Sequence, residues 1–306
     1  MTDLTDLATG LRFPEGPVCM NDGSIVLVEI ERQTLLRVGA DGRQSIVSRP
    51  GGGPNGLAVG PDGAFYVCNN GGFSWREESN MLRPGGPAAD YAGGSIQRVD
   101  PATGVATTLY DSCNGHKLLG PNDLVFDGLG GFYFTDLGKA RERDRDWGGV
   151  YYALADGSAI REVIHPILTP NGIALSPDNR RLYVAETETA RLWAWDIQSP
   201  GVLAKAPFPS PHGGRLLAGL GGFQRFDSMA VTAAGNICVA TLINGSVTVI
   251  APAGGVIEQV AMPDMFCTNI CFGGPDLRTA YITLSGAGRL VSMRWPEPGL
   301  RLAHEA

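Results

Sequence analysis

The sequence is poor in charge and in long apolar runs, and each shortage excludes a class of protein. Only 18% of the 306 residues are charged while 43% are hydrophobic, which allows a large core and excludes bulk disorder. No apolar run approaches the ~18 residues of a transmembrane helix. The net charge of −7 argues against nucleic acid or an anionic membrane surface as a partner. We therefore expect a globular protein that acts on a small molecule.

Histidine and paired cysteine are also scarce. The four histidines have no H-E-x-x-H or other paired spacing, and the six cysteines contain no C-x-x-C, so neither residue predicts a zinc site. The first ten residues, MTDLTDLATG, hold two aspartates, no basic residue and no apolar core, which is untypical of a signal peptide. We expect free thiols and a cytoplasmic location.

Glycine, by contrast, is abundant, with 43 residues, and its turns separate short alternating apolar runs. One pattern recurs six times: a polar residue, an apolar strand, a turn and a second β-rich run. The leading polar residues are Glu15, Asn55, Asn122, Asn171, Asp227 and Thr268. We call these six the ring residues. In the first five copies each stands eight positions before a turn Gly or Asn. In the sixth copy either Thr268 or Asn269 could lead, and Thr268 keeps the apolar phase of the other copies.

A third and a fourth strand follow the first two in most copies, joined by Asp-Gly or Pro-x-x-Gly turns. Four antiparallel strands repeated six times predict an all-β, six-bladed β-propeller. The sixth copy lacks a fourth strand near Trp295, and the run Leu4 to Phe13 can supply it and close the ring. No linker divides the chain, so we predict a single domain over residues 1–306.

Each ring residue begins the innermost strand of its predicted blade, so all six converge at one mouth of the central channel. Asn and Asp before Gly also form ordinary turns, but Glu15 is a poor turn residue. Two carboxylates and three carboxamides form an oxygen-rich cage of the kind that Ca²⁺ prefers. The pattern predicts one divalent metal ion, with Ca favoured and Zn, Mn or Fe as alternatives.

The motifs around these residues resemble the senescence marker protein / gluconolactonase / luciferin-regenerating enzyme family, which includes regucalcin and, more distantly, diisopropylfluorophosphatase. The matching stretches are FPEGP (13–17), GPNGLAV (53–59), GPNDL (120–124), TPNGIALSPD (169–178), FDSMA (226–230) and FGGPDLRTAY (272–281). The resemblance implies a six-bladed propeller with metal ligands at Glu15, Asn171 and Asp227. It places Asn122 as a ligand or a substrate contact, and Asp227 as the catalytic acid/base or nucleophile.

The resemblance further implies a metal-dependent lactonase. In this hypothesis the metal polarises the lactone carbonyl, Asp227 deprotonates the attacking water, and Asn122 and Asn55 orient the substrate. Gly120 stands where the sugar-lactonase members carry Arg, which leaves the substrate class open. A phosphotriesterase-like hydrolase and a non-catalytic calcium- or ligand-binding propeller are the alternatives, and a monomer or weak homo-oligomer is expected.

Two long loops are predicted to overhang the metal and set specificity. Loop 70–93 carries Phe73 and Trp75, and loop 138–148 carries Trp147 after a basic run. We expect the aromatic residues to contact substrate and the individual arginines to be solvated, although the run as a whole could attract an anion. Asp136 ends a neighbouring strand and is expected near the same mouth. His116 and His212 are expected to be loop residues rather than catalysts.

Overall fold

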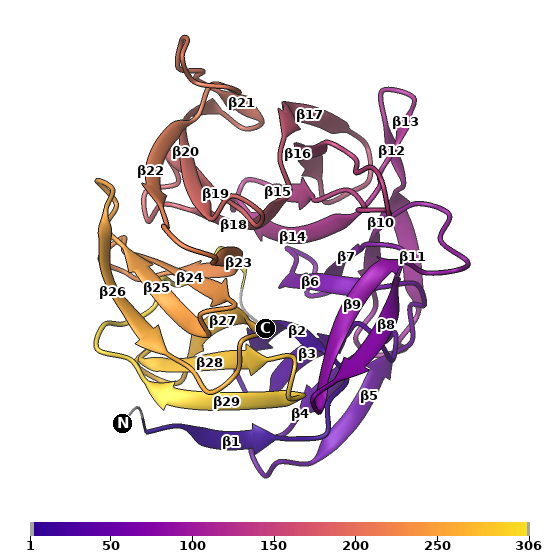
Figure 1. The fold of residues 1–306 in the computed structure, drawn as a ribbon. Helices are drawn as coiled ribbons and strands as arrows, with labels where there is room; N and C mark the ends of the chain where they lie inside the picture. The colour runs from indigo at the N-terminus through magenta and orange to yellow at the C-terminus, as the bar shows by residue number, and fades with distance from the viewer. Residues whose placement is uncertain (1–2, 305–306) are drawn as a thin grey trace.

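The structure, a computed structural model, describes residues 3–304, and every regular element in that range is a β-strand. Six antiparallel sheets stand around a central axis, as Figure 1 shows. This confirms the predicted six-bladed propeller. None of the described residues forms a helix that could cross a membrane.

Each blade runs from its innermost strand to its outermost. Blade one holds β2 (Pro14–Cys19), β3 (Ile25–Glu29), β4 (Thr34–Val38) and β5 (Gln44–Ser48). Blade two holds β6 (Pro54–Val59), β7 (Phe65–Asn69), β10 (Ser95–Val99) and β11 (Ala106–Tyr110). Blade three holds β14 (Pro121–Phe126), β15 (Gly131–Asp136), β16 (Gly148–Leu154) and β17 (Ile160–Ile167).

The other half of the ring follows the same order. Blade four holds β18 (Pro170–Leu175), β19 (Arg181–Glu186), β20 (Arg191–Ser199) and β22 (Arg215–Gly219), with the short β21 (Val202–Leu203) also paired to β20. Blade five holds β23 (Arg225–Val231), β24 (Ile237–Leu242), β25 (Ser246–Ile250) and β26 (Val256–Ala261). Blade six holds β27 (Cys267–Gly273), β28 (Thr279–Leu284), β29 (Arg289–Arg294) and β1 (Thr5–Ala8).

The N-terminal strand closes the ring, as the sequence predicted. β1 pairs antiparallel with β29, with Thr5 opposite Ser292 and Asp6 opposite Val291. The indigo β1 lies along the yellow β29 in Figure 1. Strands from the two ends of the chain therefore share the sixth blade, and this pairing holds the ring closed.

The core lies between the blades rather than at the axis. Six clusters of buried side chains each join one pair of neighbouring blades. The cluster between blades two and three packs the edge of the Tyr66 ring against Phe126, with ring centroids 5.1 Å apart. Burying an aromatic or aliphatic side chain of this size stabilises the fold by about 1.5–3 kcal/mol. This arrangement leaves the axis free for polar groups.

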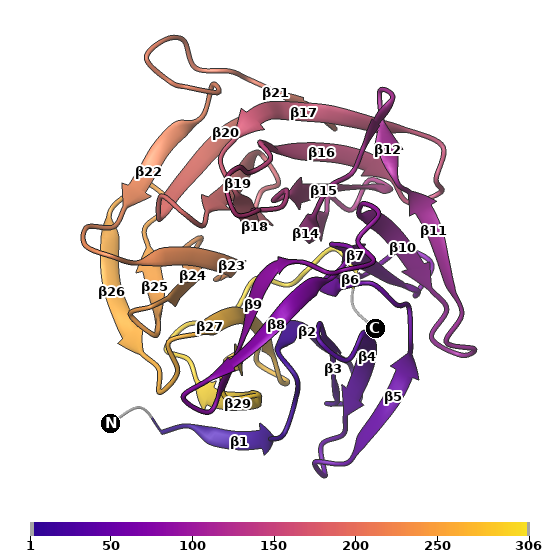
Figure 2. The ribbon, with the colours of Figure 1, turned by 45° about the vertical axis from the view of Figure 1, so that its right-hand side comes forward.

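Two hairpins stand outside the blades. The longer pairs β8 (Phe73–Glu78) with β9 (Met81–Pro87), and the shorter pairs β12 (Ser112–Cys113) with β13 (His116–Lys117). In Figure 2 the β8–β9 hairpin crosses in front of the innermost strands. Its Leu82 N–H donates to the Gly286 carbonyl of blade six over 3.0 Å, so a loop of blade two is tied to the far side of the seam.

Candidate functional site

The ring residues sit at a bulge that recurs in all six innermost strands. The pairing register shifts between Glu15 and Val18 in β2, and at the matching positions of β6, β14, β18, β23 and β27. A β-bulge re-aims a side chain relative to the regular pleat. The register of β27 gives Thr268, rather than Asn269, the place of the ring residue. In five of the six blades the bulge thus presents one polar side chain to the mouth of the channel.

The glycine that follows several ring residues permits a close approach between blades. A Cβ on Gly56 would lie 2.5 Å from the backbone carbonyl oxygen of Asn122 in blade three. A Cβ on Gly172 would lie 2.6 Å from the backbone carbonyl oxygen of Asp227 in blade five. Both distances are shorter than real Cβ contacts, so only glycine fits. The repeated Asn-Gly is therefore a packing requirement as well as a source of ligands.

Five of the six ring residues line one cavity of about 650 Å³ at a mouth of the channel. We call it the site cavity, and these five are Glu15, Asn55, Asn122, Asn171 and Asp227. Thr268 is fully buried instead, and its hydroxyl pairs with those of Thr283 and Ser285. Phe13 and Thr169, each two residues before a ring residue, also line the cavity and have positive φ angles of 55° and 45°. Such strained backbone concentrates at functional sites.

The two carboxylates of the ring repel each other, with Glu15 buried and Asp227 half-buried at the cavity. Burial raises the pKa of Glu15, which is opposed by hydrogen bonds from the Asn269 amide and the Gly16 N–H. Burial also raises the pKa of Asp227 well above its usual range, and the charge of Glu15 raises it further. Among the described residues no ion pair joins either carboxylate to a basic side chain. A compensating positive charge therefore has to come from elsewhere.

The carboxamide of Asn171 is held in place from two sides. Its Nδ2 donates to Thr187 Oγ1 over 3.0 Å, which leaves the Oδ1 atom directed away from that hydroxyl. The Asn171 backbone carbonyl accepts a 2.6 Å hydrogen bond from Thr135 Oγ1 of the neighbouring blade. Side-chain amides fixed in this way can present an oxygen to a cation without reorganising.

A second polar layer lies one residue further along the same strands, and the sequence analysis missed it. Asn269 Nδ2 donates to Glu15 Oε2 over 2.8 Å. Burial, followed by the charge of Glu15, raises the pKa of Asp123 to about 7. Ser228 hydrogen-bonds to the Asp123 carboxylate from blade five. The signal in the sequence was the replacement of Gly, at the position after the ring residue, by Asp123, Ser228 and Asn269.

The donor set fits a hard divalent cation. The described residues contain no group of three or more His, Cys, Asp or Glu side chains that could hold a metal. The ring instead offers two uncompensated carboxylates and three carboxamides at the base of a cavity. Mixed carboxylate and amide oxygens suit Ca²⁺, which also accepts water ligands. Zinc and iron sites built on imidazole or thiolate are not favoured by this chemistry.

The two predicted specificity loops contribute unequally. Phe73 of β8 lines the site cavity, while Trp75 packs on Phe13 and Phe73 with centroids 5.2 and 6.0 Å apart and does not line it. Trp147 is 60% exposed and also lies outside the lining. Lys139, which was expected only as part of a basic run, is buried in the cavity wall. The structure thus replaces the predicted aromatic wall with a mixed aromatic and basic one.

Asp136 is placed behind the site rather than in it. Its carboxylate accepts hydrogen bonds from the backbone N–H groups of Leu119, Gly120 and Gly138 over 2.7, 2.6 and 2.9 Å. These bonds fix the turn that leads into Asn122. Asn69 makes a comparable bond to the Gly53 N–H before Asn55. The residue at the end of the second strand therefore clamps the loop that presents the ring residue.

The histidines lie away from the site cavity. His212 is buried between the rings of Trp193 and Trp195, and burial lowers its pKa. His116 lies in the β12–β13 hairpin and is exposed. Neither lines the cavity, in keeping with the expectation that they are not catalysts.

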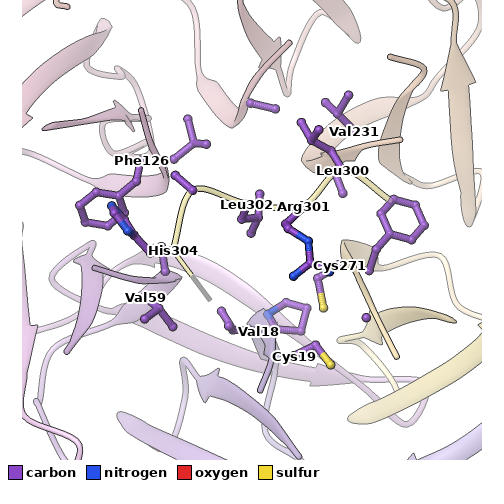
Figure 3. Close-up of a pocket in the computed structure, with 18 of the residues that line it drawn as sticks. Val18, Cys19, Val59, Phe126, Val231, Cys271, Leu300, Arg301, Leu302 and His304 are labelled. Atoms are coloured by element: carbon purple, nitrogen blue, oxygen red, sulfur yellow. The ribbon is translucent and has the colours of Figure 1, made fainter. Parts of the chain in front are cut away.

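A second cavity of about 510 Å³ lies at the other end of the channel, and we call it the opposite cavity. Figure 3 shows the C-terminal segment crossing it, with Leu300, Leu302 and His304 among the side chains drawn. The backbone of Leu300 donates to the Val231 carbonyl over 2.8 Å, and the His304 ring packs edge-on against Phe126. No residue lines both cavities: five ring residues line the site cavity, and Asp123 and Asn269, each next to a ring position, line the opposite cavity.

Fold and site together define a six-bladed β-propeller with an oxygen-rich polar ring at one mouth of its channel. The chain belongs to the SMP-30/gluconolactonase/LRE-like family, whose characteristic region matches residues 13–286. A gluconolactonase of Zymomonas mobilis is 27% identical over 89% of this chain and 76% of its own length. A drp35 lactonase of Staphylococcus saprophyticus is 29% identical over 81% of this chain and 69% of its own.

Solved structures agree with the fold. The XC5397 gluconolactonase of Xanthomonas campestris superposes with a TM-score of 0.74 at 23% identity, covering 96% of this chain and 90% of that one. Regucalcin of Agrobacterium tumefaciens, described as a calcium-binding protein, superposes with a TM-score of 0.74 at 20% identity and covers 98% of each chain. The resemblance seen in the sequence motifs is thereby confirmed.

Proposed function

We propose that this protein is a divalent-metal-dependent lactonase that opens the ring of a small lactone by adding water. The observation that carries the proposal is that two mutually repelling carboxylates, the buried Glu15 and the half-buried Asp227, line one accessible cavity with three carboxamides. A protein that used this face only for packing would not retain two uncompensated charges there. The lactonases among its relatives support the same reaction class.

Glu15, Asn171, Asp227 and Asn122 would hold the cation. Calcium suits their oxygen atoms, and Mn, Zn or Fe are the alternatives that a metal exchange would test. When bound, such an ion supplies Lewis acidity toward a carbonyl oxygen. Asn55 lines the cavity beside this set and can donate its amide to a carbonyl or hydroxyl oxygen of the substrate.

Asp227 is the residue we assign as general base. Its carboxylate takes a proton from the attacking water while the new carbon–oxygen bond forms at the lactone carbonyl. When the ring carbon–oxygen bond breaks, the protonated Asp227 returns that proton to the leaving alkoxide, and a hydroxy acid results. Thr187, which fixes Asn171, keeps the neighbouring amide in place throughout.

The test is hydrolysis of a panel of aldono-, aromatic and aliphatic lactones, followed by acid release. Enzyme treated with chelator is compared with the same enzyme after separate addition of Ca²⁺, Mn²⁺, Zn²⁺ or Fe²⁺. We expect turnover of one lactone class to disappear with the chelator and to return with one metal. Bound metal without turnover of any lactone would reject the lactonase and bring forward a phosphotriester or a purely binding role.

A further inference from the structure

The wall of the site cavity carries more positive charge than the protein as a whole would suggest. The chain has a net charge of −7. Apart from the two ring carboxylates, the charged residues of the lining are four cations and two anions. These are Arg83, Lys139, Arg145 and Arg225, with Glu78 and Glu188. If a divalent ion neutralises Glu15 and Asp227, basic residues outnumber acidic ones in the rest of the cavity lining, although the protein as a whole is acidic.

Arg225 is the cation best placed to meet a substrate. It begins β23, two residues before Asp227 on the same strand, and both line the cavity. Its Nη2 pairs with Glu188 Oε2 over 2.9 Å, and Arg145 pairs with the other oxygen of Glu188 over 3.3 Å. Two guanidinium groups thus share one carboxylate and leave a surplus positive charge. The Nε of Arg225 is buried and has no hydrogen-bond acceptor within residues 3–304.

Lys139 adds a second basic group, and no carboxylate within the described residues is in direct contact with it. Burial lowers its pKa to about 7, an effect that the charges of Asp136 and Asp146 oppose, so the group is partly protonated near neutral pH. Its Nζ donates to the uncharged oxygens Asn70 Oδ1 and Gly72 O, over 3.1 and 2.9 Å. The same nitrogen lies 3.8 Å from the centroid of the Phe73 ring, which also lines the cavity. A buried ammonium is costly unless it meets an anion. Here the ammonium group meets two uncharged oxygens and an aromatic ring, so an anionic group of a substrate could still bind to it.

Arg83, in the same cavity wall, differs from these two residues because a carboxylate pairs with it through two hydrogen bonds. Its Nε and Nη2 both donate to Glu78 Oε2, over 3.0 and 2.8 Å, within the β8–β9 hairpin. Arg225 instead makes a single contact with Glu188, which it shares with Arg145, and Lys139 donates only to uncharged oxygens. We propose that the natural substrate is a lactone that bears an anionic group, a carboxylate or a phosphate ester, away from its ring carbonyl, and that Arg225 binds this group. This inference rests on the proposed lactonase function.

The kinetic test compares three sugar lactones on metal-loaded enzyme: glucono-lactone, its 6-phosphate, and a glucarolactone with a distal carboxylate. We expect kcat/KM to be higher for one of the anionic lactones than for the neutral one, and to fall as salt is added. In Arg225→Gln the ratio of anionic to neutral kcat/KM should fall by ~30-fold, as for loss of a charge-assisted hydrogen bond. Arg98→Gln, which removes an arginine paired with Asp62 in the turn between β6 and β7, is the matched control and should leave the ratio unchanged.

A binding measurement separates failure of this inference from failure of the proposed function. Calorimetry on metal-loaded protein compares gluconate, which has one carboxylate, with glucarate and 6-phosphogluconate, which have a second anionic group. Wild type should bind one of the latter two about tenfold more tightly than gluconate, and Arg225→Gln should lose the difference. That result without turnover would reject the lactonase and keep the anion site. Turnover of neutral lactones with no anionic preference, in either assay, would overturn the anion site and keep the lactonase.

Discussion

The two ends of the central channel are lined largely by the innermost strands, but these strands present different side chains at each end. The site cavity takes its polar groups from five ring residues. The opposite cavity takes apolar side chains from positions further along the same strands, among them Leu57, Leu124 and Ile173, which also pack between the blades. Asp123 and Asn269, each next to a ring position, reach the same cavity. A shift of one or two residues along a strand therefore separates the ring of oxygen ligands from a mixed apolar and polar lining.

Removing one carboxylate from each cavity should give the largest difference in activity between the two ends of the channel. Asp227→Asn should lower kcat by ~10²–10⁴-fold, because the general base is lost, while the fold is kept. Asp123→Asn changes a buried carboxylate that lines the opposite cavity, and its kcat should stay within about fivefold of wild type. Steady-state kinetics with circular dichroism checks both. Near wild-type turnover in Asp227→Asn would remove Asp227 from the base role.

The pH dependence of the free energy of unfolding should report on the carboxylates of the two polar layers. The pKa values of Glu15, Asp123 and Asp227 are raised by burial, with that of Asp123 at about 7. The folded protein therefore holds protons that the unfolded chain releases near pH 4, and the metal-free protein loses stability as the pH rises from about 4 through 7. At ~1.4 kcal/mol per unit of pKa, the loss should reach a few kcal/mol.

Thermal unfolding between pH 4 and 8, in chelator and then in excess Ca²⁺, measures this effect. The metal should reverse the loss at neutral pH, because it binds the ionised carboxylates of the folded state. A melting temperature of the chelated protein that rises over this pH range would contradict the assignment of buried, uncompensated carboxylates.

At the opposite end the C-terminal segment should matter for stability and not for catalysis. A chain that stops after Pro298 loses the hydrogen bonds from Gly299 N to Leu277 O and from Leu300 N to Val231 O, at 2.7 and 2.8 Å. It also loses the packing of Leu300 against the cluster between blades four and five. We expect the free energy of unfolding to fall by about 2–4 kcal/mol.

Urea unfolding measures that loss, and lactone hydrolysis at a temperature where the shortened chain is folded gives the second readout. The kcat should lie within about threefold of the full chain. A tenfold or larger drop in kcat, with the fold intact, would show that the two ends of the channel are coupled.

The smallest changes in kcat/KM are expected for two aromatic residues, one inside and one outside the lining of the site cavity. Phe73→Ala removes a lining ring and should lower kcat/KM by ~10-fold. Trp147→Ala removes an exposed ring outside the lining and should change kcat/KM by less than about twofold. Parallel kinetics on one lactone provides the comparison. Equal losses in the two variants would place Trp147 over the substrate after all.

The sequence was sufficient to predict the propeller and the ring, because both arise from local repetition. The eight-residue spacing of ring residue and turn predicted the register of the innermost strands in five blades, and the apolar phase of the sixth copy correctly chose Thr268 in β27. The closure by β1 followed from a missing strand. These features depend on alternation and turn chemistry, which a single repeat already displays.

What the sequence could not predict depends on contacts between distant segments. The burial of Lys139 arises because Asn70 and Gly72, from another blade, supply its acceptors. The role of Arg225 depends on Glu188 of blade four. Asn269 reaches Glu15 only because the ring closes, across 254 positions of sequence. Nothing in the local pattern around these residues distinguishes them from solvated surface groups.

The position of the β8–β9 hairpin has a consequence for substrate entry and product release. Glu78, Met81 and Gly86 of this hairpin line the site cavity, and the hairpin crosses in front of the innermost strands in Figure 2. A molecule that enters or leaves by this mouth therefore passes the hairpin. Contacts with the hairpin would affect the arrival of substrate and the departure of product alike.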